Sequence, residues 1–192
     1  MPCIHYAVER NYVLGKSMNI FKRIYLEGKN IYEKDPACRS VLEACLLYPS
    51  IRAIITHQIA HKQYRKGRFT FARWLSQNAR KHTGIEIHPG ATIGYNIFMD
   101  HGMGIVIGET AVIGNDVTIY HGVTLGGTGN EMDAKRHPTI ENGVLVGAGA
   151  TVLGNITLGE NAKIGAGALV LDDVPANTTA VGMPVRIIYH EK

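Results

Sequence analysis

The sequence predicts an α+β fold, in which a basic α-helical region over residues 1–83 is followed by a left-handed parallel β-helix over residues 84–186. Two observations support this: large apolar residues recur every six positions, and glycine content and charge change sharply near residue 83. The repeated positions form three sets: Ile87, Ile93 and Met99; Ile107, Ile113, Ile119 and Leu125; and Ile140, Val146, Val152, Leu158, Ile164 and Val170. Neither an α-helix nor a flat strand has this period, which is typical of a solenoid whose short sides each point one large residue inward.

Small residues complete the repeat. A small or β-branched residue stands four positions after most of the inward residues, as at Ala91, Ala111 and Ala150. Glycine directly follows the inward residue at Gly94, Gly108, Gly114, Gly126, Gly147, Gly159 and Gly165. We expect these glycines to supply unusual φ angles at tight corners.

The first part of the chain is basic and predicts helices. Residues 1–82 hold 15 of the 20 Lys and Arg and 5 of the 16 Asp and Glu, a net charge of +10, whereas residues 83–192 hold 5 and 11, a net charge of −6. Helices are expected over 19–32, 37–48, 51–66 with Ser50 as N-cap, and 69–82, closing before Gly84. Aromatic interleaving and a nucleic-acid reader motif are both missing, so we expect no nucleic-acid partner.

Composition argues against several other classes. No apolar run approaches the ~20 residues that cross a bilayer, and no cleavable leader is evident, so the sequence predicts a cytoplasmic protein without a membrane partner. Cys3, Cys38 and Cys45 are odd in number and lack metal-site spacing, which indicates reduced thiols. His57 and His61 share one helical face, but Gln58 stands where a zinc hydrolase needs glutamate. We expect no metal, and packing of these histidines against the solenoid.

Two interruptions of the period predict where binding occurs. Eight residues separate Met99 from Ile107, and fifteen separate Leu125 from Ile140, so loops are expected at 100–104 and 126–138. Insertions into a solenoid project from one face, which is often the binding face. Both predicted loops carry histidine and charge.

An ordered set of motifs narrows the function. The set comprises residues 85–91 (IEIHPGA), 99–110 (MDHGMGIVIGET), 122–129 (GVTLGGTG) and 136–138 (RHP), with 35–37 (DPA), 59–61 (IAH) and 182–186 (GMPVR) around it. Together these residues resemble the serine O-acetyltransferase family of hexapeptide-repeat acyltransferases, from about residue 35 onward. The resemblance implies transfer of the acetyl group of acetyl-CoA to the hydroxyl of L-serine, giving O-acetyl-L-serine for cysteine biosynthesis.

The resemblance assigns His101 as the general base that deprotonates the serine hydroxyl, a role that suits an imidazole with an ordinary pKa of ~6.5. Glu86 stands where the family has an acidic partner of that histidine, which would hold the ring and stabilise the imidazolium. Contact between Glu86 and His101 depends on how the loop folds back, and His88 is a rival partner.

Further residues are implied in substrate binding. Asp35 and Asp100 would hold the serine ammonium group, with a helix cap as the alternative role of Asp35. Arg136 and His137 would bind the carboxylate, for which arginine offers a bidentate fork. Glu109 is expected to support these groups from behind.

The acetyl donor is expected to lie along the groove between neighbouring prisms. Small residues would let the pantetheine arm approach closely, and a lysine could meet the nucleotide phosphates. The candidate residues for binding acetyl-CoA are Gly127, Thr128, Ala148, Lys163 and Ala166.

The resemblance also implies partners. Three prisms around a threefold axis would form sites at their interfaces, so we expect a homotrimer, with a hexamer as an open alternative. L-Cysteine is expected to compete with serine. Family members with a flexible isoleucine-ended tail bind O-acetylserine sulfhydrylase through it; this chain is expected to form no tight tail-mediated complex, because its end at residues 187–192 is short and finishes at the charged Lys192.

Two other functions stay open. A related enzyme that acetylates a sugar hydroxyl would keep His101 but would not need Arg136 and His137 for a carboxylate. A catalytically silent scaffold would not need the intact loops.

Overall fold

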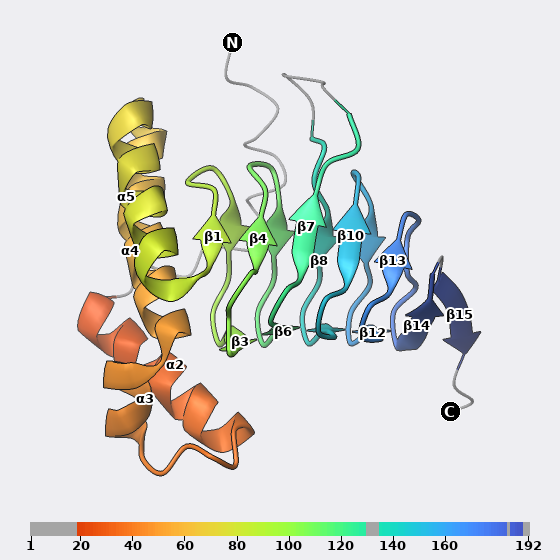
Figure 1. Cartoon of the computed structure of the whole chain (residues 1–192), viewed down its shortest axis with the longest axis horizontal. Helices are drawn as coiled ribbons and strands as arrows, with labels where there is room; N and C mark the ends of the chain where they lie inside the picture. Colours follow the sequence, from red (N-terminus) through yellow and green to blue (C-terminus); the bar gives the residue numbers. More distant parts are fainter. Residues whose placement is uncertain (1–18, 130–134, 184, 190–192) are drawn as a thin grey trace.

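The protein is described here by a computed structural model, which describes residues 19–129, 135–183 and 185–189 (Figure 1). Four helices pack at one end of a solenoid of short strands, and the strands stack coil upon coil away from them. This confirms the predicted order of a helical region followed by a parallel β-solenoid. Cys3 lies outside the described residues. So do residues 190–192, on which the expectation about the sulfhydrylase depends.

The helices are α2 (Ile20–Lys34), α3 (Val41–Leu47), α4 (Pro49–Arg65) and α5 (Phe69–Thr83). Two of their starts differ from the predicted ones. The second helix begins at residue 41 instead of 37, because the side chain of Ser40 caps it by accepting the Glu43 N–H. Ser50 is not the N-cap of α4, because Pro49 already occupies the first helical turn, where its missing N–H has no cost. The last helix ends as predicted, at Gly84 with φ +71°.

Three parallel sheets form the sides of the solenoid. The five-stranded sheet contains β1 (Glu86–Ile87), β4 (Val106–Ile107), β7 (Thr124–Gly126), β10 (Thr151–Leu153) and β13 (Leu169–Val170). The four-stranded sheet contains β2 (Thr92–Ile93), β5 (Val112–Ile113), β8 (Thr139–Ile140) and β11 (Thr157–Leu158). The six-stranded sheet contains β3 (Phe98–Asp100), β6 (Thr118–Tyr120), β9 (Leu145–Val146), β12 (Lys163–Ile164), β14 (Thr178–Gly182) and β15 (Val185–Tyr189). Every predicted inward residue lies in the core and is at most 7% exposed.

The glycines after the inward residues serve a different purpose from the predicted one. None of the seven has a positive φ. Instead, they let neighbouring coils approach: a Cβ at Gly94 would overlap the backbone of Gly114, and a Cβ at Gly108 would overlap the ring of His137. The left-handed φ angles fall elsewhere, for example at Gly102 and Gly104. The seven glycines that follow the inward residues are therefore required because they lack a side chain, and not because they adopt a special backbone conformation.

Buried polar contacts attach the helices to the first coil. The Glu27 carboxylate accepts the backbone N–H groups of Asn96 and Ile97 at 3.2 and 2.9 Å, and it pairs with Arg23 at 3.4 Å. Arg23 in turn donates to the Gly94 carbonyl at 2.6 Å. Side-chain ion pairs that are almost fully buried require such partners. The helical region and the solenoid are therefore joined by specific bonds as well as by apolar packing.

The two helical histidines also contact the first coil, as the sequence predicts. A ring nitrogen of His61 lies 2.8 Å from the Pro89 carbonyl oxygen. His57 is buried, and burial lowers the pKa of its imidazole to about 3. Both rings therefore belong to the packed interface between α4 and the solenoid.

The C-terminal part is longer than expected. β15 reverses direction and pairs antiparallel with β14, with Ala180 opposite Ile187. The predicted boundary at residue 186 therefore falls inside a strand. Val185 and Ile187 alternate toward the core, where they pack against it and close the last coil.

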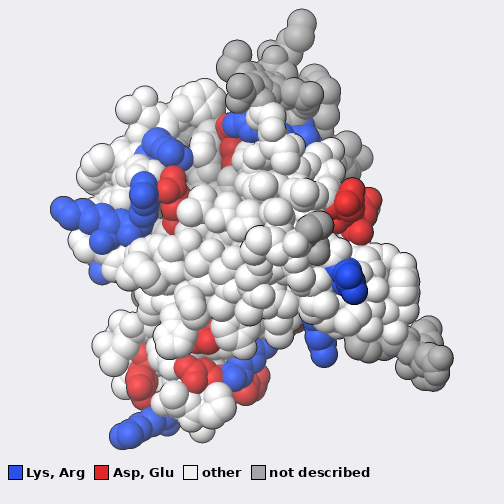
Figure 2. Space-filling model, turned by 45° about the vertical axis from the view of Figure 1, so that its right-hand side comes forward, with Lys and Arg blue, Asp and Glu red and all other residues white. Residues whose placement is uncertain are grey.

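No helix in the described residues is long and apolar enough to cross a bilayer. Within the same residues, no group of three or more His, Cys, Asp or Glu side chains could hold a metal ion. Figure 2 shows one face of the molecule, on which charged side chains lie mainly around the margin and few occupy the centre.

Candidate functional site

The predicted site residues fall on two different edges of the prism. The His101 edge, where the chain passes from the six-stranded to the five-stranded sheet, comprises residues 101–105, 121–123, 147–150 and 165–168. The Arg136 edge, where it passes from the five-stranded to the four-stranded sheet, comprises the described residues 88–91, 108–111, 127–129, 135–138 and 154–156. One side of the prism separates the two edges. At ~3.3 Å per residue, the five residues from Gly104 to Gly108 span roughly 15 Å.

At the His101 edge, Asp100 is the last residue of strand β3 and His101 follows it. His101 has a left-handed backbone, φ +57°, which is uncommon for a residue other than glycine. Its ring is exposed, with Nε2 3.9 Å from a carboxylate oxygen of Asp100. The ring of His121 stands almost perpendicular to it at 5.7 Å. Sequence reasoning missed His121, although it occupies the same position one coil later, two residues after the inward Ile119.

Asp35 belongs to the same edge. Its carboxylate accepts the O–H of Tyr48 at 2.5 Å and the N–H of Ala37 at 2.8 Å. The hydrogen bond from Tyr48 is the main cause that lowers the pKa of Asp35, and nearby His101 acts in the same direction. Asp35 is the C-cap residue of α2 and its side chain shapes the turn that follows, which fits the alternative role. Its carboxylate lies near His101, and binding of the serine ammonium group stays a prediction. Tyr48 was not selected from the sequence.

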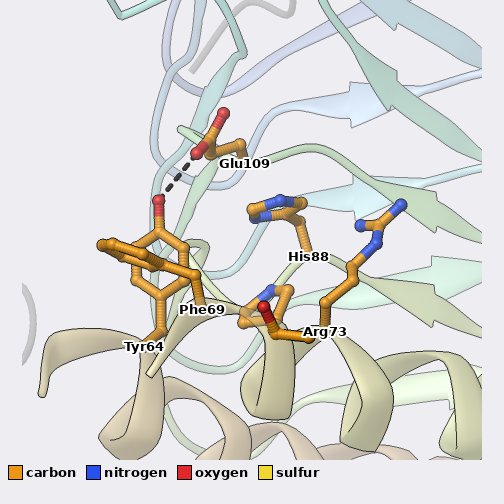
Figure 3. A pocket seen from close by; sticks show the side chains of 7 residues that line it. Tyr64, Phe69, Arg73, His88 and Glu109 are labelled. Carbon is orange, nitrogen blue, oxygen red and sulfur yellow. Dashed lines mark hydrogen bonds between the residues drawn. The ribbon is translucent and has the colours of Figure 1, made fainter. Parts of the chain in front are cut away.

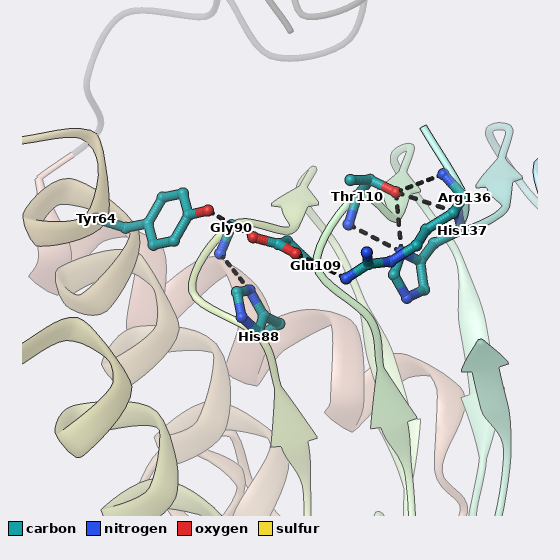
Figure 4. A network of polar contacts seen from close by, with 7 residues as sticks. All are labelled: Tyr64, His88, Gly90, Glu109, Thr110, Arg136 and His137. Atoms are coloured by element: carbon teal, nitrogen blue, oxygen red, sulfur yellow. Dashed lines mark hydrogen bonds and ion pairs between the residues drawn. The ribbon is translucent and has the colours of Figure 1, made fainter. Parts of the chain in front are cut away.

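At the Arg136 edge, residues from two coils and one helix form a connected network (Figure 4). Arg136 pairs with Glu109 at 3.0 Å, and the other oxygen of Glu109 accepts the O–H of Tyr64 at 2.7 Å. The hydroxyl of Thr110 lies within hydrogen-bond distance of the backbone of Arg136 and of the backbone and ring of His137. The structure thus brings together Glu109, Arg136 and His137 as expected. Tyr64 lies outside the motifs, and Thr110, the last residue of the 99–110 motif, had no role assigned to it from the sequence.

Burial and neighbouring charges shift the pKa values of several groups at this edge. Burial by itself raises the pKa of Glu109, but the Tyr64 O–H and the nearby positive groups together lower it. Burial lowers the pKa of His137, and Arg136 adds to this effect. Burial also lowers the pKa of Lys135 to about 8. The network therefore holds a carboxylate that is readily ionised beside an imidazole that is readily kept neutral.

A hollow of about 550 Å³ opens between the helices and this edge. Tyr64, Phe69 and Arg73 from the helices and His88 and Glu109 from the solenoid line it, together with Thr70 and Pro89 (Figure 3). Burial is the main cause that lowers the pKa of His88. His88 thus lies at the Arg136 edge, which excludes it as a partner of His101 within one chain.

Glu86 does not pair with His101 within the chain. Its carboxylate is held by three side chains of α5: Arg73 at 3.4 Å, Arg80 at 3.2 Å and Gln77 at 3.2 Å. Among the described residues, no hydrogen bond or ion pair joins Glu86 to His101. The loop at 100–104 approaches the start of the first coil, where the Gly104 N–H donates to the Gly84 carbonyl at 2.9 Å. The ring of His101 is nevertheless exposed and Glu86 is held by α5, so the direct contact that the sequence left open is not formed within one protomer.

The residues expected to bind acetyl-CoA are divided in the same way. Gly127 and Thr128 are exposed on the Arg136 edge, whereas Ala148 and Ala166 lie on later coils of the His101 edge. Lys163 is exposed on β12. One chain therefore presents two incomplete groups of candidate residues.

Comparisons with known proteins agree on one family. The six-repeat model of the bacterial transferase hexapeptide matches residues 137–172. A serine acetyltransferase from Synechococcus elongatus is 54% identical over 170 residues, which are 88% of this chain and 69% of the relative. A serine acetyltransferase from Bacillus licheniformis is 55% identical over 168 residues, 88% of this chain and 77% of the relative.

The chain belongs to the serine acetyltransferase family. Solved structures of serine acetyltransferases have the same fold. The Neisseria gonorrhoeae enzyme in complex with serine is 46% identical with a TM-score of 0.82. The match covers 87% of this chain and 68% of the Neisseria chain. The Brucella abortus enzyme in complex with coenzyme A is 44% identical with a TM-score of 0.84, and the match covers 88% of this chain and 67% of the Brucella chain. A serine acetyltransferase in complex with cysteine is 42% identical with a TM-score of 0.86, and the match covers 90% of this chain and 67% of that structure's chain.

Proposed function

We propose that this chain transfers the acetyl group of acetyl-CoA to the hydroxyl of L-serine, at sites that two neighbouring protomers of a homotrimer build together. The family assignment supports the reaction. The single observation that supports the shared site is the division of the candidate residues between two edges of one prism. Neither edge alone holds both His101 and Arg136.

A threefold arrangement would bring the two edges together. If each prism turned its five-stranded sheet toward the axis, the His101 edge of one protomer would lie beside the Arg136 edge of the next. On the outward face of that sheet, the side chains that follow Glu86 in register from strand to strand are uncharged. This column consists of Val106, Thr124, Thr151 and Leu169, in register from β4 to β13. Such a column can pack closely around an axis without burying an unpaired charge.

In the proposed reaction, Asp35 and Asp100 of one protomer hold the serine ammonium group. Arg136 and His137 of the neighbour hold the carboxylate. His101 takes the hydroxyl proton as the serine oxygen forms a bond to the thioester carbon, and the carbon–sulfur bond then breaks. The protonated imidazole returns its proton to the departing thiolate, so that free coenzyme A and O-acetyl-L-serine leave.

Acetyl-CoA would lie in the groove between two prisms. Gly127 and Thr128 would contact it from one protomer, and Ala148 and Ala166 from the other. Small side chains at these places leave the backbone accessible to the pantetheine arm. Exposed Lys163 is the proposed contact of the nucleotide phosphates.

Binding of the serine carboxylate is tested by Arg136→Ala. Removing a charged bidentate donor is expected to raise the KM for serine by roughly 10- to 100-fold, with little change in the KM for acetyl-CoA. Serinamide should be a poor substrate of the parent enzyme. Equal use of serine and serinamide, or an unchanged KM for serine in the variant, would contradict the proposed site and favour a sugar hydroxyl as acceptor.

The shared site is tested by mixing subunits. His101→Ala and Arg136→Ala protomers are unfolded together in equal amounts, refolded, and assayed at a serine concentration well below the KM. In random trimers about a quarter of the interfaces join an intact His101 edge to an intact Arg136 edge, so activity should recover to about a quarter of that of the parent. A mixture that shows only the average activity of the two variants would overturn the shared site.

A further inference from the structure

Thr110 takes part in four hydrogen bonds at the Arg136 edge, and these determine which ring nitrogen of its neighbour His137 carries a hydrogen. The Thr110 Oγ1 lies 3.0 Å from the backbone nitrogen of Arg136 and 3.1 Å from that of His137. Backbone amides can only donate, so both lone pairs of the hydroxyl are occupied as acceptors. The hydroxyl hydrogen is then left to point at the remaining neighbour, Nδ1 of His137, at 2.8 Å.

A second donor reaches the same ring nitrogen. The backbone N–H of Thr110 donates to Nδ1 of His137 at 3.2 Å. A nitrogen that accepts from two donors carries no hydrogen of its own. The neutral imidazole of His137 must therefore carry its hydrogen on Nε2.

The other side of the ring carries Nε2. Nε2 of His137 points away from Thr110 (Figure 4), across Gly108, where the absence of a side chain leaves room for the ring. No acceptor for Nε2 is found within residues 19–129, 135–183 and 185–189, and the guanidinium of Arg136 lies beside the ring. The Nε2–H is thus available to an acceptor that also suits an arginine.

We propose that Thr110 is a positioning residue that fixes His137 as a neutral Nε2–H donor to the carboxylate of the acceptor substrate, and that this arrangement prevents His137 from acting as a general base. The inference rests on the proposed function, because it takes the substrate carboxylate as the acceptor. To act as a base, His137 would have to accept a proton at Nδ1, against two hydrogens that already point there. His101 has no comparable restraint: its ring is exposed, and Nε2 has only a distant carboxylate, 3.9 Å away.

Electrostatics agrees with this geometry. Burial and the charge of Arg136 both lower the pKa of His137, which favours the neutral ring. The groups that face the ring are Arg136 and Lys135 on its own loop, and Glu109, Thr110 and His88 on the neighbouring coils. Of these, only the Glu109 carboxylate favours protonation, and it is already paired with Arg136 and Tyr64.

The test compares three variants. Thr110→Val keeps the shape but removes the hydroxyl, Thr110→Ser keeps the hydroxyl, and Thr178→Val is a matched control that removes another threonine hydrogen bond, to Pro175, at the far end of the solenoid. Thr110→Val is expected to raise the KM for serine roughly 10- to 100-fold, with kcat and the KM for acetyl-CoA nearly unchanged. At least two hydrogen bonds of the hydroxyl are lost, and each contributes a factor of about five. Thr110→Ser should restore the KM, and Thr178→Val should not change it. Equal KM values for Thr110→Val and the parent would overturn the positioning role.

A second readout does not depend on activity. Nitrogen NMR of the ¹⁵N-histidine-labelled parent, with the His137 signals identified by their loss in His137→Gln, reports the hydrogen on each ring nitrogen. A bare Nδ1 and a protonated Nε2 at pH 7 are expected. A hydrogen on Nδ1 would overturn the inference even if Thr110→Val did not fold. If the NMR result is as expected but Arg136→Ala leaves the KM for serine unchanged, the proposed carboxylate site fails while the ring assignment stands.

Discussion

Gly108→Ala tests whether the shape of the Arg136 edge controls serine binding. The added methyl group would occupy the space of the His137 ring, with overlaps at Cδ2 and Nε2. The backbone of Gly108 cannot move away easily, because its N–H donates to the Leu125 carbonyl at 3.0 Å and its own carbonyl accepts from Ala111 at 3.2 Å. The ring must therefore leave its place, and its two bonds to Thr110 are lost.

The magnitude follows from these bonds. At a net ~1 kcal/mol for each hydrogen bond, displacing the ring removes about 2 kcal/mol, which corresponds to a roughly 30-fold rise in the KM for serine. The assay is the initial rate of coenzyme A release at varied serine and saturating acetyl-CoA. Because the proposed damage is confined to the carboxylate site, the KM for acetyl-CoA should change little.

A double-mutant cycle gives the control. If the methyl group acts only by displacing His137, then Gly108→Ala should have almost no further effect in a His137→Ala background. The reasoning is refuted if Gly108→Ala binds serine normally, or if it weakens binding by the same factor with and without the ring.

Three further outcomes are expected. His101→Ala should lower kcat by roughly 10²–10⁴-fold with the fold and acetyl-CoA binding retained, and near-normal turnover would remove His101 from the chemistry. L-Cysteine should inhibit competitively against L-serine, and Arg136→Ala should weaken both by a similar factor; inhibition that is not competitive with serine would place cysteine elsewhere. The low pKa of buried His57, about 3 against an ordinary 6.5, means that the unfolded chain binds a proton that the folded chain excludes. Stability from this group is present above pH 6.5 and is lost as the pH falls toward 3. The free energy of unfolding of the parent relative to His57→Gln should fall by up to ~1.4 kcal/mol per pH unit, measured by urea unfolding between pH 7 and 5, and a constant difference would contradict the burial argument.

The repeat was predictable because its physical requirement is strict. A side of the prism that lacks a large inward residue at positions such as Ile113 or Val152 would leave a cavity. Each side therefore needs one such residue, and large apolar residues recur every six positions in the sequence. The reason for the glycines was not predictable from one chain. Their positions are determined by contacts between coils, such as that of Gly108 with His137, and period alone does not reveal which atoms meet.

Most residues of the candidate site could be chosen from motifs, but the contacts between them could not. Motifs indicated His101, Arg136 and Glu109. Tyr48 and Tyr64 lie outside the motifs, and Thr110 ends one of them without an assigned role, because the role of each depends on where its hydroxyl lies in space. The Glu86 pairing failed for a similar reason: α5 packs its two arginines over β1, and such helix packing is not encoded in the spacing of residues 86 and 101.

The backbone of His101 has a consequence for how the protein would respond to selection for stability. In the described chain, five residues other than glycine have a left-handed φ, and the other four are Asn96, Asp116, Asn161 and Asn177. Asparagine and glycine adopt this conformation at lower cost than histidine, whose strain is of order 1 kcal/mol. A screen that rewards only thermal stability is therefore expected to accumulate Asn or Gly at position 101 and to yield well-folded, more stable and inactive proteins. If His101 is the general base, as proposed, activity and stability favour different residues at this corner of the solenoid.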